Sequence, residues 1–160
     1  GTAVWADELD PPEPRPGADP PEVRPGYTID SVPIGEPLRP LVAHVSADAA
    51  RRLATDDLDV HHQRYTEAET PAISPYFIAA RMSPLTRHNF TYGPTIHVRS
   101  QVQHLAEPTG GQDVTIDAVI VDAYDRKDHW YQVLDGVVVG SIGGRLATLR
   151  HHTIFRPRGT

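Results

Sequence analysis

The sequence predicts an α+β fold in which a long curved antiparallel sheet wraps around one central helix. Residues 74–90 form an apolar helical pattern, and four stretches after residue 94 have the composition of strands. A helix that is apolar around most of its circumference is normally buried, and the strands are long enough to cover it. Because strands joined by short links pair as antiparallel neighbours, we expect each of the four to lie beside the next.

Length and composition favour one domain preceded by a tail. The chain has 160 residues, of which 39% are hydrophobic, and it has no apolar run long enough to cross a membrane. Residues 1–26 hold seven prolines and six acidic residues against two arginines, so we expect a disordered, solvated tail before a domain over residues 27–158. The net charge of −6 argues against nucleic acid or an anionic membrane as partner, and the lack of cysteine fits a cytoplasmic protein.

Short elements open the domain. Residues 27–32 alternate like an edge strand, and residues 42–45 are a further candidate strand. Ser46 is placed to cap a helix over residues 49–54, because its hydroxyl can accept a free N–H of the first turn. The polar stretch over residues 55–65 has no clear periodicity and holds the densest group of ionisable side chains in the domain.

The central helix begins at a recognisable signal. Ser74 is its expected cap, and Pro75 takes the first helical position, where a missing N–H costs nothing. Pro84 is expected to kink or end the helix near Met82, because a proline inside a helix removes a backbone hydrogen bond.

Four strands follow, over residues 96–103, 114–124, 129–139 and 146–155. In the first of them, simple alternation places Ser100 and Val102 on one face, and His97 and Arg99 on the other. His151 and His152 are neighbours in the last strand, so we expect them to face opposite sides of the sheet.

Several segments resemble MaoC-like hydratases and dehydratases of actinobacteria. The resemblance rests on residues 93–105, Pro108 with the turn at 111–114, the charged hairpin at 125–129, the closing strand at 150–157, and the opening at 38–40 and 45–49. It covers residues 27–158 and implies a single hotdog fold. It also implies a lyase that hydrates or dehydrates an acyl thioester on coenzyme A or a carrier protein, without a metal or a redox cofactor.

The resemblance places acid–base chemistry in the polar stretch. Hydratases of the family hold an acid and, five residues later, a histidine, because water addition needs a base for the water and an acid for the α-carbon. Asp57 and His62 have this spacing, with Asp59 where the motif has asparagine. Asp56 and His61 have it too; we prefer the first pair because it keeps a polar side chain at the middle position. A solvated loop is the alternative interpretation.

The resemblance locates the donors for the thioester oxygen at the start of the central helix. Pro75 has no N–H, so the expected donors are the Ser74 hydroxyl and the Tyr76 N–H. His97 could face the acyl tunnel, and Arg99 could meet the phosphates of coenzyme A or of a phosphopantetheine arm. The alternatives are a structural histidine and a solvated arginine.

An open strand edge favours a homodimer, with a heterodimer with another hotdog chain as the alternative. Because hotdog folds host several activities, three rival functions stay open. They are a natural-product tailoring enzyme that catalyses cyclisation or elimination on a polyketide-like substrate, a thioesterase, and a non-catalytic partner subunit. The altered helix start and the unusual acid–histidine stretch favour the first of these rivals.

Overall fold

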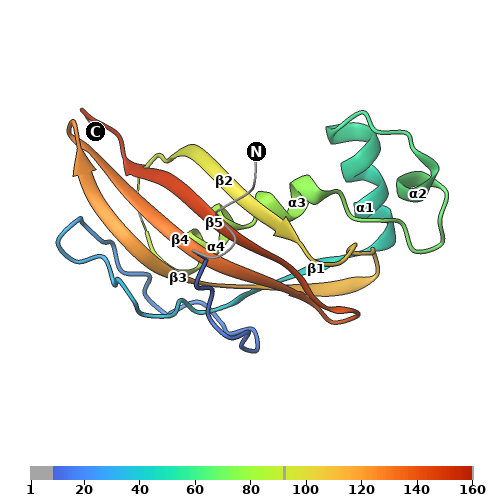
Figure 1. Ribbon diagram of the computed structural model, residues 1–160, viewed down its shortest axis with the longest axis horizontal. Coiled ribbons are helices and arrows are strands. Elements are labelled where there is room, and N and C mark those ends of the chain that lie inside the picture. The colour runs from blue at the N-terminus through green and yellow to red at the C-terminus, as the bar shows by residue number, and fades with distance from the viewer. Residues whose placement is uncertain (1–8, 92, 160) are drawn as a thin grey trace.

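The computed structural model describes residues 9–91 and 93–159, which form one sheet with α3 and α4 against its inner face (Figure 1). The strands are β1 (Leu41–Val45), β2 (Ile96–His104), β3 (Gln112–Arg126), β4 (His129–Gly140) and β5 (Gly144–Arg156). The helices are α1 (Ala47–Arg52), the π-helical turn η2 (Leu53–Asp57), α2 (Gln63–Thr66), α3 (Pro75–Ala79) and α4 (Met82–Asn89).

All strand pairs are antiparallel, in the order β1-β3-β4-β5-β2. The predicted α+β fold, a long curved antiparallel sheet around a central helix, is thereby confirmed (Figure 1). One expected pairing is wrong, because β2 lies beside β5 and not beside β3, which follows it in the chain. Since β3 already pairs with β1 on one side and β4 on the other, β2 is left at an edge of the sheet.

The central helix is two consecutive helices, α3 and α4, where the sequence predicted one helix with an irregularity. The break lies at Ala80 and Arg81, just before Met82. The Arg81 carbonyl accepts the Leu85 N–H at 3.0 Å, which is the first helical hydrogen bond of α4. Pro84 lies in that first turn, where a missing N–H breaks no intrahelical bond, so it starts a helix rather than interrupting one.

The two helices and the inner face of the sheet share the main hydrophobic core. From the helices, Ile78, Met82 and Leu85 are fully buried. Their partners are alternate residues of β3, β4 and β5, namely Ile116, Ala118, Ile120, Leu134, Val138, Ala147 and Leu149. Gly136 of β4 allows close packing, because a Cβ there would come within 2.9 Å of the Met82 Cε.

A β-bulge in β2 changes the faces that simple alternation predicts. The register of β2 on β5 shifts between His97 and Arg99, which leaves Val98 as the extra residue. His97 and Ser100 therefore both lie on the inner face, whereas Arg99 lies on the outer face. The prediction that His97 and Arg99 share a face is wrong for this reason.

Residues 9–15 lie along the outer face of the sheet, and residues 18–26 continue past the segment before β1 toward the end of α4 (Figure 1). Arg15 Nη2 lies 2.6 Å from Asp117 Oδ1 of β3, and the Arg15 Nε donates to Oδ2 at 2.9 Å. Further hydrogen bonds join this segment to Leu38, Pro40, His88 and Thr91. These contacts correct the expectation of a solvated tail for residues 9–26, while residues 1–8 lie outside the described residues.

The outer face also buries a second carboxylate beneath this segment. Asp135 of β4 is fully buried, and it receives hydrogen bonds from the Arg150 Nε and Nη2, both at 2.7 Å. The Asp10 N–H donates to the same carboxylate at 2.9 Å. Buried carboxylates need such donors, so Asp10 and Arg15 complete the polar network on this face.

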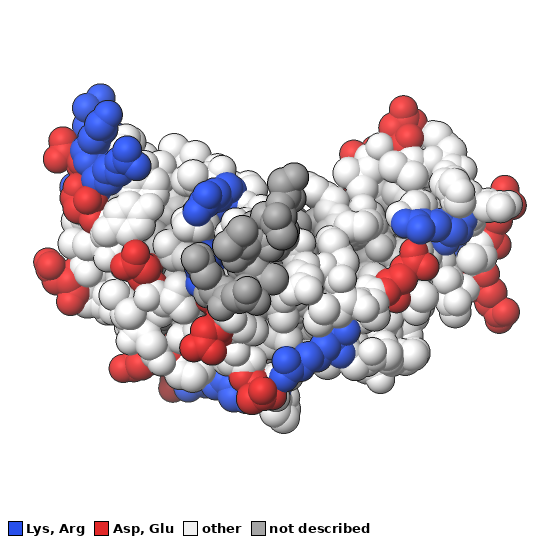
Figure 2. Space-filling view, in the orientation of Figure 1, with Lys and Arg blue, Asp and Glu red and all other residues white. Residues whose placement is uncertain are grey.

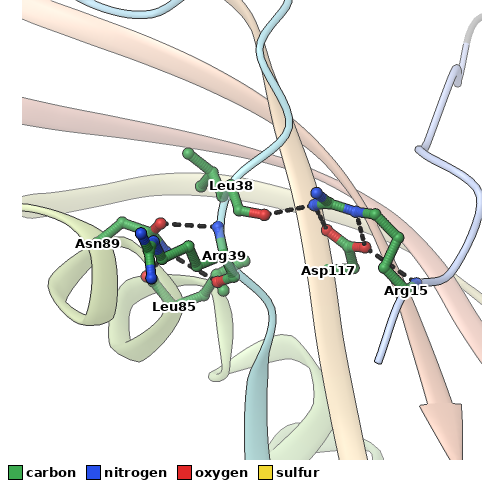
Figure 3. Close-up of polar contacts among 6 residues, drawn as sticks. All are labelled: Arg15, Leu38, Arg39, Leu85, Asn89 and Asp117. Atoms are coloured by element: carbon green, nitrogen blue, oxygen red, sulfur yellow. Dashed lines mark hydrogen bonds and ion pairs between the residues drawn. The ribbon is translucent and has the colours of Figure 1, made fainter. Parts of the chain in front are cut away.

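Asn89, at the end of α4, fixes the segment that precedes β1 (Figure 3). Its Oδ1 accepts the Arg39 N–H at 2.7 Å, and its Nδ2 donates to the carbonyls of Arg39 and Leu85, each at 3.0 Å. On the other side of the segment, the Leu38 carbonyl accepts a hydrogen bond from Arg15. Asn89 of α4 thus holds Arg39, and Arg15 of the N-terminal segment holds the adjacent Leu38.

Residues 27–32 do not form the predicted edge strand. They contain a turn, in which the Ser31 N–H donates to the Thr28 carbonyl at 3.1 Å. Tyr27 is nevertheless buried, because its ring packs against Phe90 and Phe155 at centroid distances of 4.5 and 4.9 Å. The predicted strand that follows is confirmed as β1.

Charged side chains of both signs are interspersed on the face shown in Figure 2. Lys and Arg gather at one end of the molecule, but acidic groups lie directly beside them. On this face the charges therefore do not form the continuous basic stripe that a nucleic-acid interface needs.

Candidate functional site

The α1–α2 segment, residues 47–66, stands at one end of the sheet (Figure 1). Ser46 begins it as predicted, because its Oγ accepts the Ala49 N–H at 3.1 Å. After α1 the chain continues as the wider turn η2, which ends at Asp57. Such π-helical turns are rare in proteins, but many of those that occur lie at functional sites. The predicted acid thus stands at the end of a helical segment rather than in an irregular loop.

Asp57 lines an open groove between the α1–α2 segment and α3, which we name the Asp57 groove. It encloses about 260 Å³ and is lined by His44, Val45, Ala49, Arg52, Leu53, Asp57, Phe77 and Arg81. Phe77 lies in α3 and Arg81 follows it directly, so the predicted acid lies beside the central helix. The Asp57 side chain is exposed, and no described residue donates a hydrogen bond to it.

Two arginines give this groove a positive character. The Arg81 guanidinium carbon lies 4.1 Å from the centroid of the Phe77 ring, and its Nε donates to the Phe77 carbonyl at 3.2 Å. Burial lowers the pKa of Arg81, although a guanidinium stays charged at neutral pH. Within the described ranges, neither Arg81 nor Arg52 forms an ion pair with a carboxylate.

Sequence reasoning did not single out Arg52 or Arg81. The signal for Arg81 was its spacing of four residues from Phe77, which puts two side chains of a helix on the same side. Nothing in the sequence indicates that Arg52 lines the same groove as Phe77 and Arg81, because that depends on the tertiary arrangement of α1 and α3.

His62 does not line the Asp57 groove. It is the N-cap of α2, where its exposed ring accepts the Arg64 N–H on Nδ1 at 3.3 Å. Among the residues that the structure describes, no hydrogen bond or ion pair joins His62 to Asp57. The two side chains with the family spacing therefore lie on one segment without direct contact.

The alternative pair is not assembled either. Asp56 accepts a hydrogen bond from the Thr55 hydroxyl at 2.7 Å, whereas the His61 Nε2 lies 2.7 Å from Asp59 Oδ1. His61 and Asp59 are both exposed. Asp59 has a left-handed φ of 52°, which aspartate tolerates better than most residues.

The start of α3 already uses one of the two donors expected for a thioester oxygen, the Tyr76 N–H. Ser74 is buried, and its Oγ accepts the Tyr76 N–H at 3.3 Å. Its carbonyl accepts the Phe77 N–H at 2.9 Å. Tyr76 is 59% exposed. A second groove of about 370 Å³ meets this end of the helix at Ile73 and Pro75, apart from the lining of the Asp57 groove.

His97 belongs to a polar cluster on the inner face of β2 and β5. Its Nε2 lies 3.0 Å from the Ser100 Oγ, which lies 2.8 Å from the His151 Nδ1, and the two imidazole rings stack at 4.8 Å. The buried His151 Nε2 and Thr153 Oγ1 have no partner among the described residues. Burial, followed by the charges of His97 and His152, lowers the pKa of His151 to about 4, so this ring is neutral at pH 7.

Arg99 lies on the opposite face of the sheet from this cluster. Its Nη2 donates to the His152 Nε2 at 3.3 Å. His151 and His152 thus face opposite sides, as alternation predicts. The structure brings His97 together with Ser100 and His151, but it separates Arg99 from them by the sheet.

Residues 9–91 and 93–159 contain neither a metal-binding cluster nor a candidate membrane-spanning helix. No three His, Asp or Glu side chains come close enough together to hold a metal ion there. No helix in those ranges is both long and apolar enough to cross a membrane.

No family model matches the sequence, and no curated protein matches it. Solved structures do match. The (R)-hydratase from A. caviae involved in PHA biosynthesis is 16% identical, with a TM-score of 0.63 over 78% of this chain and 98% of that one. The MaoC-like dehydratase from Rhodospirillum rubrum is 14% identical, with a TM-score of 0.60 over 82% and 99%. The protein has the hotdog fold.

A third structure with the hotdog fold is a two-chain assembly. The HadBC (3R-hydroxyacyl-ACP dehydratase) complex from Mycobacterium tuberculosis is 10% identical, with a TM-score of 0.62 over 76% of this chain and 96% of that one. These likenesses agree with the MaoC-like resemblance of the sequence, and at such low identity they show the fold of the hotdog domain rather than its chemistry.

Proposed function

We propose that the hotdog domain catalyses the reversible hydration of an enoyl thioester, or the reverse dehydration of a 3-hydroxyacyl thioester, carried on coenzyme A or a carrier protein. The observation that carries the proposal is the position of Asp57, an exposed carboxylate in a groove against the central helix. Support also comes from structural neighbours whose titles describe hydratases and dehydratases.

The proposed chemistry assigns Asp57 as the base. Its carboxylate takes a proton from the water whose oxygen bonds to the β-carbon, and the α-carbon receives a proton. His62 is the proposed donor of that proton; it regains a proton from solvent while Asp57 loses one to solvent, which restores both groups after each turnover. Because its Nδ1 accepts the Arg64 N–H, the neutral ring carries its proton on Nε2, the nitrogen left for the reaction.

The proposed donor for the thioester oxygen is the Tyr76 N–H. Its present hydrogen bond to the Ser74 Oγ is 3.3 Å long, which is beyond the usual range for an N–H donor. A substrate oxygen, which gains negative charge in the transition state, is a stronger acceptor than a hydroxyl. His97 is the proposed contact for the far part of the acyl chain on the inner face of β2, and Asp59 orients the acid–histidine stretch.

We propose that two copies of the chain pair through β2. This strand is at an edge of the sheet, and its residues Ile96 and Val98 are each 48% exposed. An open edge with exposed apolar residues favours pairing with another strand. A heterodimer is the alternative, since the titles of two neighbours describe the ChsH1-ChsH2 complex and the HadBC complex.

A tailoring reaction on a polyketide-like substrate is the second candidate. It is favoured by the lack of contact between Asp57 and His62 and by the use of the Tyr76 N–H within α3. An acyl thioesterase is the third, favoured by a structural neighbour titled a thioesterase superfamily member.

The test is the loss of enoyl absorbance when the full chain meets a short and a medium trans-2-enoyl-CoA, with free thiol measured in parallel. Loss of absorbance without thiol release supports the hydratase. Thiol release supports the thioesterase instead. If neither signal changes, hydration of these substrates is rejected, and the next substrates to test are those for cyclisation or elimination.

A further inference from the structure

The Asp57 groove combines two cations with an apolar floor. Arg81 and Arg52 face only one carboxylate there, Asp57, and neither arginine is paired within the described residues. The remaining basic group, His44, is occupied by Asp113, whose Oδ1 lies 2.7 Å from the His44 Nδ1. The groove therefore carries excess positive charge on a chain whose net charge is −6.

Arg81 is held in a state that suits anion binding. Its ring contact with Phe77 and the bond from Nε to the Phe77 carbonyl fix the guanidinium plane. The two terminal nitrogens make no hydrogen bond to a described residue, so their donors remain for a ligand. Burial, partly offset by Tyr76, lowers the pKa of this side chain, as expected for a guanidinium that is partly removed from water.

The apolar walls limit what the anion is attached to. Val45, Leu53 and Phe77 line the groove beside the arginines, and its volume is about 260 Å³. This space accommodates a carboxylate or a phosphate group on a short alkyl stem, with the stem against the apolar side chains.

We infer that the Asp57 groove is an anion subsite, in which Arg81 and Arg52 bind a carboxylate or phosphate group of the ligand. This inference rests on the proposed function for the identity of the ligand as an acyl thioester. The anion comes either from a carboxylate on the acyl chain or from the phosphates of the carrier. In either case Arg81 supplies the directional hydrogen bonds and Arg52 adds charge at the rim.

The test is calorimetric binding to the full chain, which needs no turnover. The first probe is succinate, compared with succinamide, which has the same shape and no charge. Arg81→Gln is expected to weaken succinate binding about tenfold, and Arg52→Gln about threefold. Arg87→Gln, on the exposed side of α4 and outside the groove lining, is the matched control and should leave binding unchanged.

Asp57→Asn provides a test of opposite sign. Removing the only carboxylate of the groove is expected to tighten succinate binding about threefold, because a like charge beside the anion is lost. A purely structural role of the groove does not predict tighter binding. This variant also checks the fold, since Asp57 makes no hydrogen bond to a described residue and its replacement should leave stability unchanged.

Two larger probes separate the sources of the anion. Succinyl-pantetheine carries an acyl carboxylate without phosphate, and coenzyme A carries phosphates without an acyl carboxylate. If Arg81→Gln weakens the binding of succinyl-pantetheine, the subsite binds the acyl carboxylate. If it weakens the binding of coenzyme A, the subsite binds the phosphates of the carrier. The inference is overturned if Arg81→Gln and Arg52→Gln bind all of these probes as the wild type does. Anion binding by a protein that hydrates no enoyl-CoA would instead reject the proposed function and keep the subsite.

Discussion

Arg15, in a segment predicted to be solvated, is ion-paired with Asp117, whose side chain is only 1% exposed (Figure 3). The same arginine donates to the Leu38 carbonyl, so it joins the N-terminal segment, β3 and the stretch before β1. The hydrogen bond that Arg15 donates to Asp117 is the main cause that raises the pKa of Arg15. The proline-rich segment is therefore part of the folded domain.

The first prediction concerns this ion pair. Arg15→Ala leaves a buried carboxylate without its cation, and we expect the free energy of unfolding to fall by about 2 kcal/mol. Breaking a fully buried ion pair costs about 3–5 kcal/mol. We expect a smaller loss here because the Arg15 side chain is 40% exposed. Urea denaturation measures the loss. Arg24→Ala is the control, since Arg24 is an exposed arginine of the same segment; an equal effect of both variants would contradict this assignment.

The second prediction is a loss of stability in mild acid that depends on His151. Its pKa is 6.5 in the unfolded chain and about 4 in the folded protein. Between these values the unfolded chain binds a proton that the folded protein does not, so stability falls as the pH decreases from about 6.5 toward 4. The loss is at most about 3 kcal/mol.

Urea denaturation at pH 7 and pH 5 checks this prediction. His151→Gln should remove much of the difference in stability between the two pH values. His104→Gln, which changes an exposed histidine of β2, should keep the wild-type difference. A His151→Gln variant with the full wild-type pH dependence would show that the buried ring is not the group responsible.

The third prediction tests the pairing of two copies through β2. Replacing both Ile96 and Val98 by lysine places charge on the open edge, and we expect a dimer to become a monomer in sedimentation equilibrium. Val23→Lys, at a residue that is 80% exposed in the N-terminal segment, should leave the mass unchanged. A wild-type chain that is monomeric at all concentrations, or a double variant that stays dimeric, would exclude this interface.

Much of the fold could be predicted from local patterns. Ser46, Ser74 and Pro75 marked helix starts correctly, because capping depends on residues close in sequence. The strands β3, β4 and β5 followed from runs of β-branched residues between turn signals. The break before Met82 was anticipated from Pro84, although the proline proved to begin the second helix rather than to end the first.

The errors arose where the outcome depends on distant contacts. The faces predicted for β2 by simple alternation were wrong because of the bulge at Val98. That bulge depends on how β2 pairs with β5. The composition of residues 9–26 indicated disorder, but buried carboxylates on the outer face of the sheet hold that segment in place. For the site, spacing identified Asp57, whereas the two arginines beside it come from elements whose packing the sequence does not reveal.

The most direct test of the proposed function compares Asp57→Asn with Asp56→Asn in the hydration of trans-2-enoyl-CoA. The two aspartates are neighbours in η2 and both are exposed, but only Asp57 lines the groove. If Asp57 is the base, Asp57→Asn lowers kcat by about 10²–10⁴-fold while Asp56→Asn stays close to wild type. Equal activity of Asp57→Asn and wild type would contradict the account, because the carboxylate in the groove would then take no part in the proton transfer.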